Sequence, residues 1–382
     1  MSGPLEGVRV VELAHIMAGP VCGLMLADMG ADVIKVERPE GDDTRRMLPP
    51  DVNGESAAFM MMNRNKRGVA LDLKREDGRA AFLKLIAKAD ILIENHRKGV
   101  LERLGLGYEV LERTNPALVH VEISGFGRTG PYAERGGFDL IAQGMSGLMS
   151  ITGEGSGRPP VKVGAPVSDI TAGVLGAMGA LAAYSQRLKT GKGQRVDTSL
   201  FEAGIVHTYW QSAIAFATGV APGPMGSAHP LNAPYAAFRC SDGWICVGAA
   251  NQRNWERLLA ILDAPEIAED PRFRDNAGRM GHREALEAAL NRVFSRRSSA
   301  EWLEKLEAAG VPAGPVLDVR QMHADPQTRA REMVAATEHP VAGRVETLGL
   351  PVKFSATPGG VRRPAPRLGE HNAEVLGEVD ED

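Results

Sequence analysis

Strand-like and helical stretches alternate along the first two hundred residues, and this alternation constrains the fold more than any other feature. The apolar run Val8–Leu13 predicts a buried strand, a helix follows to Gly30, and Asp32–Val36 predicts a second strand. This β-α-β order predicts parallel strands joined by a crossover helix. Further elements are predicted as strands at Val69–Leu73, Asp90–Ile93, Leu118–Ile123 and 194–200 and as a helix over Glu76–Lys88. We therefore expect an α/β fold with an open, largely parallel, Rossmann-like sheet, which binds ligands at the carboxyl ends of its strands.

A second, smaller domain is predicted in the carboxyl-terminal half. The 382 residues exceed the size of about 250–300 residues at which single hydrophobic cores stop growing. Two strand-like runs, split by Ser241-Asp242-Gly243, predict a hairpin that is followed by helical patterns. The expected organisation is a large domain of residues 1–200 and 330–382, a linker of 201–224, and a small α+β domain of 225–329.

Charge and cysteine content narrow the class of protein. A net charge of −4 argues against nucleic-acid binding, which favours a basic excess. Cys22, Cys240 and Cys246 form no CxxC pair and no histidines stand at metal-ligand spacing, so we expect a reducing compartment and no metal. No secretory signal is visible, and the uncharged apolar run Ala172–Tyr184 is shorter than the roughly 20 residues that span a bilayer. We expect a cytoplasmic protein without nucleic-acid or membrane partners.

One carboxylate, Asp169, stands at the start of an apolar helix rich in small residues. Ser168 and Asp169 precede the run like an N-cap, and Gly173, Gly176 and Gly179 follow at every third position. Each interior glycine costs about 1 kcal/mol relative to alanine, so three in register indicate that another part of the structure approaches this helix closely. For Asp169 itself, a helix cap is the simple alternative to a catalytic role.

The glycine-rich stretch Gly125–Gly130 matches the dinucleotide-binding pattern GxGxxG. It follows the fifth predicted strand rather than the first, Pro131 comes directly after it, and no acidic residue ends a strand about 20 residues further on. We interpret it as a glycine-rich turn. The patterns GxxxxGK[ST] and GxSxG are absent from the sequence, so neither a phosphate loop nor a hydrolase nucleophile elbow is predicted.

Basic residues gather where the predicted strands end. They are Arg38, Lys74-Arg75, Asn95-His96-Arg97-Lys98 and Arg103, with Asn65-Lys66-Arg67 before the third strand. The carboxyl ends of parallel strands meet at one edge of a sheet, so this group could bind a polyphosphate through charge-assisted hydrogen bonds. The alternative is a set of solvated surface cations.

Several ordered stretches together resemble the class III coenzyme A transferases, the group that contains formyl-CoA:oxalate transferase. The matching stretches are residues 4–10, Ala18-Gly19-Pro20, residues 26–37, Asn65-Lys66-Arg67, residues 71–74, residues 125–131, Ser168-Asp169, the hairpin near Gly243 and Gly310-Val311-Pro312. The resemblance implies an α/β large domain, a small domain and a homodimer whose two subunits thread through one another like linked rings.

The same resemblance assigns roles to individual residues. The family nucleophile maps onto Asp169, and His15 and Met17 fall on the substrate side of the site. The CoA-contacting positions map onto Ala18, Arg38, Leu71, Asp72, Leu73, Lys74, Asn95, His96, Arg97 and Arg103. With a pKa near 4 an aspartate is ionised at neutral pH and attacks an acyl-CoA thioester without a general base. The implied route runs through an aspartyl anhydride and an aspartyl-CoA thioester, with no metal, ATP or nucleotide cofactor.

Two departures from the formyl-CoA:oxalate pattern bear on the substrate. Gly248-Ala249-Ala250-Asn251 stands where those enzymes resemble one another in a run of glycines, and Met17 stands where they carry glutamine. Gly226-Ser227-Ala228-His229 and Pro234-Tyr235 are similar to the branch that uses succinyl-CoA and dicarboxylates such as glutarate. We therefore expect transfer of CoA from succinyl-CoA to a carboxylic acid, with formyl-CoA:oxalate transfer as an alternative.

Two other activities stay open at this point. The related α-methylacyl-CoA racemases resemble one another in a Gly-His-Asp sequence, whereas this chain has Gly137-Phe138-Asp139 and lacks that imidazole. A CoA-binding protein without catalysis is the remaining alternative, because cations alone do not distinguish binding from turnover.

Overall fold

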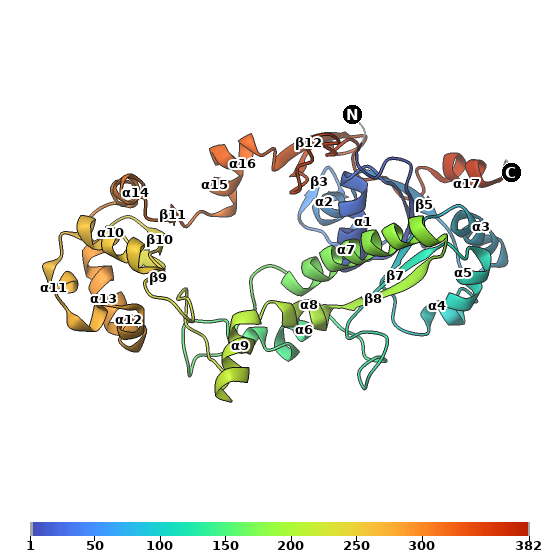
Figure 1. Ribbon diagram of the computed structural model, residues 1–382. Helices are drawn as coiled ribbons and strands as arrows, with labels where there is room; N and C mark the ends of the chain where they lie inside the picture. The colour runs from blue at the N-terminus through green and yellow to red at the C-terminus, as the bar shows by residue number, and fades with distance from the viewer. Residues whose placement is uncertain (1–2, 381–382) are drawn as a thin grey trace. The chain divides into compact units, whose positions relative to one another are not determined.

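The computed structural model describes residues 3–380 and divides into two compact units (Figure 1). The first unit comprises residues 1–148, 162–207 and 325–382, and the second comprises residues 149–161 and 208–324. The small domain predicted from the sequence spans residues 225–329, whereas the second compact unit spans residues 149–161 and 208–324.

A six-stranded parallel sheet forms the centre of the first unit. Its order is β5-β2-β1-β6-β7-β8. The strands are β1 (Arg9–Leu13), β2 (Asp32–Glu37), β5 (Lys66–Ala70), β6 (Ile91–Glu94), β7 (Val119–Ser124) and β8 (Gln194–Ser199). From β1 the chain proceeds to β2 on one side, whereas β6 leads to β7 on the other side. The order therefore reverses between β1 and β6, and ligands bind at the carboxyl ends of the strands at such a switch point.

Successive residues of a strand belong alternately to two hydrophobic cores, one on each face of the sheet. Val10 packs with α1 (Ala18–Asp28) and α7 (Val167–Thr190), whereas its neighbour Val11 packs with α3 (Glu76–Ala87), α5 (Tyr108–Thr114) and α17 (Asn372–Asp380). Because both faces are covered, the central strands are apolar runs rather than alternating ones. This three-layer arrangement confirms the expected α/β fold with an open parallel sheet.

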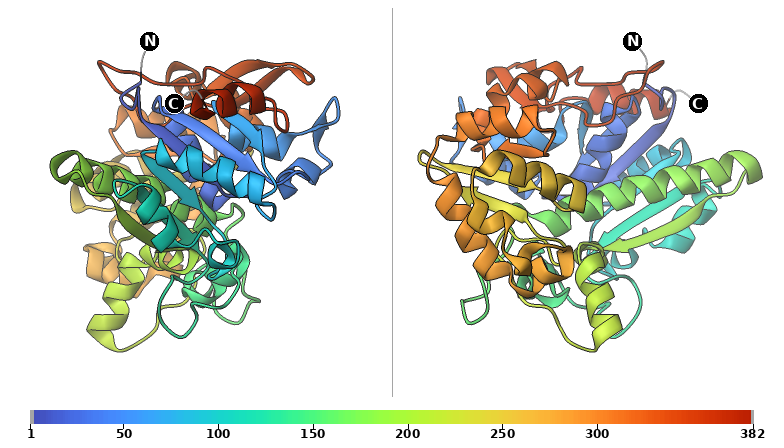
Figure 2. Two further views of the ribbon diagram at one scale, coloured as in Figure 1. Left: turned by 90° about the vertical axis from the view of Figure 1, so that its right-hand side faces the viewer. Right: turned by 60° about the vertical axis from the view of Figure 1, so that its left-hand side comes forward.

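The glycines of α7 allow close contact with neighbouring elements, and Figure 2 shows this helix lying along the sheet. A Cβ atom on Gly173 would lie 2.6 Å from the Ala18 carbonyl oxygen of α1, and one on Gly176 would lie 2.7 Å from Ile123 of β7. A Cβ atom on Gly179 would lie 2.5 Å from Val196 of β8. By length and composition alone α7 could cross a membrane. Its small-residue face instead packs against α1 and the sheet, as in the core helix of a globular unit.

The remaining elements of the first unit are short or lie near its ends. They are β3 (Asp51–Val52), β4 (Glu55–Ser56), α2 (Ala57–Asn63), α4 (Val100–Arg103), α6 (Asp139–Met145), α8 (Leu200–Val206), α16 (Pro326–Ala330), β12 (Val334–His339) and β13 (Gly343–Leu348). β12 and β13 pair as an antiparallel hairpin.

The second unit contains a three-stranded antiparallel sheet with helices packed on it. The sheet has the order β11-β10-β9, from β9 (Tyr235–Arg239), β10 (Trp244–Gly248) and β11 (Ala313–Pro315). The helices are α9 (Tyr209–Thr218), α10 (Gln252–Leu262), α11 (Pro265–Ala268), α12 (Asn276–Gly281), α13 (Arg283–Phe294), α14 (Ser299–Ala308) and α15 (Val319–Ala324). Phe238, Trp255, Phe294 and Trp302 are fully buried in its core.

Two expected elements differ in the structure. The third strand of the sheet covers Lys66–Ala70 rather than Val69–Leu73. Its first two residues are charged but buried, because Lys66 pairs with Glu12 and Arg67 pairs with Asp32, and this pairing conceals the strand from an apolar pattern. The stretch 201–224, expected as a linker, contains most of α8 and all of α9, which His207 and Thr208 separate.

Candidate functional site

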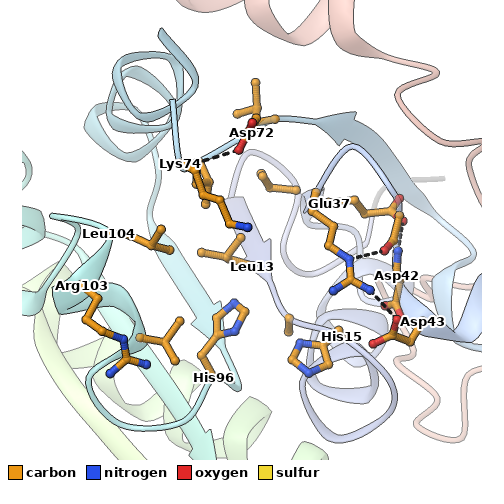
Figure 3. Close-up of a pocket in the computed structure, with 17 residues that line it drawn as sticks. Leu13, His15, Glu37, Asp42, Asp43, Asp72, Lys74, His96, Arg103 and Leu104 are labelled. Carbon is orange, nitrogen blue, oxygen red and sulfur yellow. Dashed lines mark hydrogen bonds and ion pairs between the residues drawn. The ribbon is translucent and has the colours of Figure 1, made fainter. Parts of the chain in front are cut away.

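A cavity of about 410 Å³ opens at the carboxyl ends of β1, β2, β5 and β6, at the switch point of the sheet (Figure 3). Residues from the ends of all four strands and from α4 line it: Leu13, Ala14, His15, Val36, Glu37, Arg38, Gly41, Asp42, Asp43, Leu71, Asp72, Leu73, Lys74, His96, Val100, Arg103 and Leu104. Three of the strand-end cations of the sequence, Arg38, Lys74 and Arg103, thus meet in one place. We call this space the strand-end cavity.

Two cations of the strand-end cavity are available to a ligand. Within residues 3–380 neither the Lys74 ammonium nor the Arg103 guanidinium has a hydrogen-bond or ion-pair partner, and both side chains are exposed. In Figure 3 the Lys74 ammonium points into the space in the middle of the view, and the Arg103 guanidinium lies at its edge below Leu104. Arg38 differs, because it donates to the Gly41 carbonyl at 3.0 Å and pairs with Asp43. A ligand with several anionic groups fits this distribution of charge.

The cations before the third strand do not join this cavity. Lys66 is fully buried and lies 2.7 Å from Glu12, and Arg67 pairs with Asp32 and with Glu378 of α17. Their role is to connect the sheet with its neighbouring elements. The sequence pattern alone does not distinguish such structural cations from ligand-binding ones, because both stand beside strands.

Two histidines form part of the wall of the strand-end cavity. The ring centroids of His15 and His96 lie 5.3 Å apart, one ring from the loop after β1 and the other from the loop after β6. Burial lowers the pKa of His96 to about 4 and also lowers the pKa of His15. Both imidazoles are therefore neutral near pH 7 and offer hydrogen bonds and ring surface rather than charge.

The Asn95 side chain forms hydrogen bonds with the backbone of His15, beside this wall. Its amide oxygen accepts the His15 N–H at 3.0 Å and its amide nitrogen donates to the His15 carbonyl at 2.8 Å. Asn95 thus bridges the loops that follow β1 and β6, the two strands at the switch point. The structure places it as a support of the wall.

The predicted site residues divide into four groups by their position. His15, Arg38, Leu71, Asp72, Leu73, Lys74, His96 and Arg103 line the strand-end cavity. Met17, Ala18 and Asn95 belong to the adjoining loops and the start of α1 but do not line it. Arg97 lines a second cavity, and Asp169 lines neither of them.

The second cavity, of about 330 Å³, contains a buried group of charges. Arg128 pairs with Glu94 and lies 3.3 Å from Glu122, which also pairs with Arg195 at 2.6 Å. Glu94, Glu122 and His120 are close enough to hold a metal ion. The two guanidinium groups already supply the positive charge that these carboxylates require, so the residue set favours an ion-paired cluster over a metal centre.

Asp169 lies in the first turn of α7 rather than at its N-cap. The helix begins at Val167 with Pro166 at the cap position, and no side chain caps it. Within the described part of the chain the half-buried Asp169 carboxylate accepts no hydrogen bond. The position of Asp169 therefore does not match the alternative role of a helix cap. A first-turn carboxylate is still stabilised by the helix dipole, but its oxygen atoms stay available for chemistry.

A second carboxylate, Asp139, lies beside this turn. One oxygen of Asp139 accepts the Ser168 N–H at 2.9 Å and the other accepts the Gln143 amide at 2.7 Å. Burial raises the pKa of Asp169 to about 7, and the charge of Asp139 adds to the effect. The expectation of an ordinary pKa near 4 is thus corrected: near pH 7 only about half of Asp169 is ionised. Nothing in the sequence indicates that Asp139 lies near Asp169, because the two residues stand 30 positions apart on different helices.

Known proteins resemble this chain along its whole length. The model of CoA-transferase family III matches residues 5–372. The succinate–glutarate CoA-transferase of Agrobacterium fabrum is 40% identical over 384 residues, covering 99% of this chain and 96% of that protein. The acetyl-CoA:oxalate CoA-transferase of Acetobacter aceti is 41% identical over 375 residues, covering 98% and 95%. A crystal structure of a CAIB/BAIF family protein from Brucella suis superimposes with a TM-score of 0.89 at 41% identity and covers all of both chains.

Proposed function

Because this chain belongs to CoA-transferase family III and is a CoA-transferase, we propose that it moves CoA from succinyl-CoA to a dicarboxylic acid such as glutarate. The family expected from the sequence is confirmed. Support for succinyl-CoA and glutarate comes from the 40% identical relative named for succinate and glutarate. The relative named for acetyl-CoA and oxalate is equally similar and makes that pair the alternative.

The strand-end cavity is the proposed site for the nucleotide end of CoA. The observation that carries this assignment is the pair of unpartnered cations, Lys74 and Arg103, at the switch point of a parallel sheet. The phosphate groups of CoA would receive charge-assisted hydrogen bonds from them, and Arg38 would exchange Asp43 for a phosphate oxygen. Leu71 and Leu73 provide apolar surface for the adenine ring of CoA.

Asp169 is the proposed nucleophile. Its ionised oxygen attacks the thioester carbon of succinyl-CoA, which forms a mixed anhydride and releases the CoA thiolate. The thiolate attacks the aspartyl carbon of the anhydride, which expels succinate and leaves an aspartyl-CoA thioester. The acceptor carboxylate then reverses both steps, so the thioester passes to the acceptor and Asp169 is regenerated. The free hydrogen-bonding capacity of the Asp169 oxygen atoms supports this role.

The raised pKa of Asp169 has a consequence for this chemistry. A carboxylate with a pKa of about 7 is a stronger nucleophile than one with an ordinary pKa, at the cost of a smaller ionised fraction. Asp139 contributes by its nearby charge while its own oxygen atoms hold the backbone of Ser168 and the side chain of Gln143.

A homodimer is proposed as the functional assembly. Helix α9 exposes large apolar side chains: Tyr209 is 75% exposed, Trp210 is 58% exposed and Phe216 is 89% exposed. None of the residues of this ten-residue helix is buried within the chain. An apolar surface of this kind is typical of an interface, and a second copy of the chain, threaded as the family resemblance implies, would cover it.

The decisive experiment is a transfer assay with a panel of donors and acceptors. The purified protein is mixed with succinyl-CoA and glutarate, and glutaryl-CoA is measured by mass spectrometry. The same assay with acetyl-CoA and oxalate tests the alternative pair. Faster transfer between acetyl-CoA and oxalate than between succinyl-CoA and any dicarboxylate would overturn the substrate assignment. Exchange of the α-proton of a 2-methylacyl-CoA with deuterated solvent, without an acceptor, would instead indicate racemase chemistry.

A further inference from the structure

We propose that Asp42 is a positioning residue, which holds the loop between β1 and α1 in the shape that forms one wall of the strand-end cavity. The inference begins at Ile16, which adopts a φ of +65°. This left-handed conformation is unfavourable for an L-residue and more so for a β-branched one. Such a residue persists only where surrounding contacts determine its conformation.

Three side chains, one from β2 and two from the segments that follow β2 and β6, hold three successive residues of this loop. The Lys35 ammonium donates to the Ala14 carbonyl at 2.8 Å. Asn95 bridges the N–H and carbonyl of His15, as described above. The two oxygen atoms of Asp42 lie 3.2 and 3.3 Å from the Ile16 nitrogen and accept its N–H. The loop is therefore anchored from β2, from the segment after β2 and from the end of β6.

Asp42 is itself rigidly held. One of its oxygen atoms also accepts the Thr44 N–H at 2.9 Å and the Thr44 hydroxyl at 2.8 Å, and the other lies 3.0 Å from the Lys35 ammonium. Lys35 in turn pairs with Glu12 of β1 at 3.1 Å. Asp42, Lys35 and Glu12 are all buried, so these contacts are not exchanged for water.

The charge of Asp42 persists across the physiological pH range. Burial alone would raise the pKa of this carboxyl, but the Lys35 ammonium and the hydrogen bonds from Thr44 outweigh burial and hold the pKa well below its usual range. Asp42 therefore stays a double acceptor. By restraining Ile16 it orients His15, whose ring lines the cavity, and it sets the direction in which the chain enters α1 at Ala18.

The test uses the freedom of glycine to adopt positive φ. Asp42→Asn weakens the restraint on Ile16, and we expect the Kd of CoA, measured by calorimetry, to rise at least tenfold. Ile16→Gly in the Asp42→Asn background removes the conformational penalty, so the Kd should return to within about threefold of the wild-type value. Ile16→Ala in the same background is the matched control, since it shortens the side chain but keeps a Cβ atom, and it should not restore binding.

The outcomes separate the proposal from its alternatives. An unchanged Kd in Asp42→Asn, or equal rescue by alanine and glycine at position 16, would overturn the positioning role. Asp42→Asn combined with Asp263→Gly, which relieves a positive φ of 50° in the second unit, should give no rescue. If the double variant Asp42→Asn with Asp263→Gly bound CoA normally, the rescue would reflect a general gain of stability and not relief of strain at Ile16.

A second measurement covers the case in which Asp42→Asn does not fold. In the wild-type background Ile16→Gly should unfold at a temperature at least as high as Ile16→Ala, the reverse of the usual order for these residues. A clearly lower unfolding temperature for Ile16→Gly would contradict a strained loop. The binding test rests on the proposed function. A wild-type protein that binds no CoA would refute that function, whereas the order of unfolding temperatures would still test the strained loop.

Discussion

Asp139 accepts the backbone N–H of Ser168 at 2.9 Å, and this contact places a second negative charge beside the neighbouring residue, Asp169. Burial of Asp169 and this neighbouring charge explain why a carboxylate in the first turn of a helix, where the dipole favours ionisation, nevertheless has a raised pKa. Burial is the larger cause and Asp139 adds to it. Both groups are open to direct tests.

Replacement of Asp169 by alanine should abolish transfer while the protein still folds. The proposed covalent route has no other nucleophile, so we expect kcat to fall by at least three orders of magnitude, on the order of 4 kcal/mol in the activation barrier. Steady-state kinetics with succinyl-CoA and glutarate provide the measurement, and circular dichroism verifies the fold. A variant that keeps more than a tenth of the wild-type turnover would remove Asp169 from this role.

Incubation with succinyl-CoA alone should leave an electrophilic acyl group on Asp169. Anhydrides and thioesters react with hydroxylamine, so the trapped protein should carry a hydroxamate at this residue. Peptide mass spectrometry locates the modification, and Asp139, which is engaged in two hydrogen bonds, is the internal control. Turnover without any modification of Asp169 would contradict the covalent route.

Activity should rise with pH through about pH 7. The reactive form of Asp169 is the carboxylate, and its pKa is raised to about 7, so kcat/KM should increase roughly tenfold between pH 6 and pH 8. Asp139→Asn keeps an acceptor for the Ser168 N–H but removes the charge, so the midpoint of the profile should move to lower pH. A midpoint that Asp139→Asn leaves in place would show that this charge has no influence on Asp169.

The same pKa links Asp169 to stability. Its folded pKa of about 7 exceeds the ordinary value of 3.8, so the native state binds this proton more tightly than the unfolded chain does. The stabilisation of the folded state by this protonation is complete below about pH 4. It is lost as the pH rises through about 7. Asp169→Asn should therefore unfold at a higher temperature than the wild type at pH 8, by on the order of 2–4 °C, with no gain at pH 4. A lower unfolding temperature at pH 8 would contradict the raised pKa.

Lys74 and Arg103 should contribute mainly to CoA binding. Loss of one charge-assisted contact to a phosphate costs about 1.5–3 kcal/mol, so each alanine variant should raise the KM for succinyl-CoA by roughly 10- to 100-fold with little change in kcat. Arg97→Ala is the matched control, since this residue lines the other cavity and we expect a smaller effect. Equal effects for all three variants would disprove the assignment of the strand-end cavity.

The sequence predicted the fold because apolar strands and helices alternate without interruption. It was less informative where charged residues are buried. Lys66 and Arg67 begin a strand, yet their pattern suggested a cation cluster for a ligand. The loop after β1 was also concealed, since nothing local indicates that Ile16 adopts a positive φ or that Asp42, 26 residues later, holds it. Family resemblance located Asp169, but its raised pKa depends on burial and on a spatial neighbour, Asp139.

The close approach of α7 to α1 at Gly173 limits which substitutions this helix can accept. Because the backbone at Gly173 lies directly against the Ala18 carbonyl, the helix that carries Asp169 and the helix that follows the cavity loop share one fixed spacing. Any side chain at this position would force the two helices apart. A side chain at position 173 would therefore shift Asp169 relative to the loop after β1, whereas substitutions outside this contact leave the spacing of the two helices unchanged.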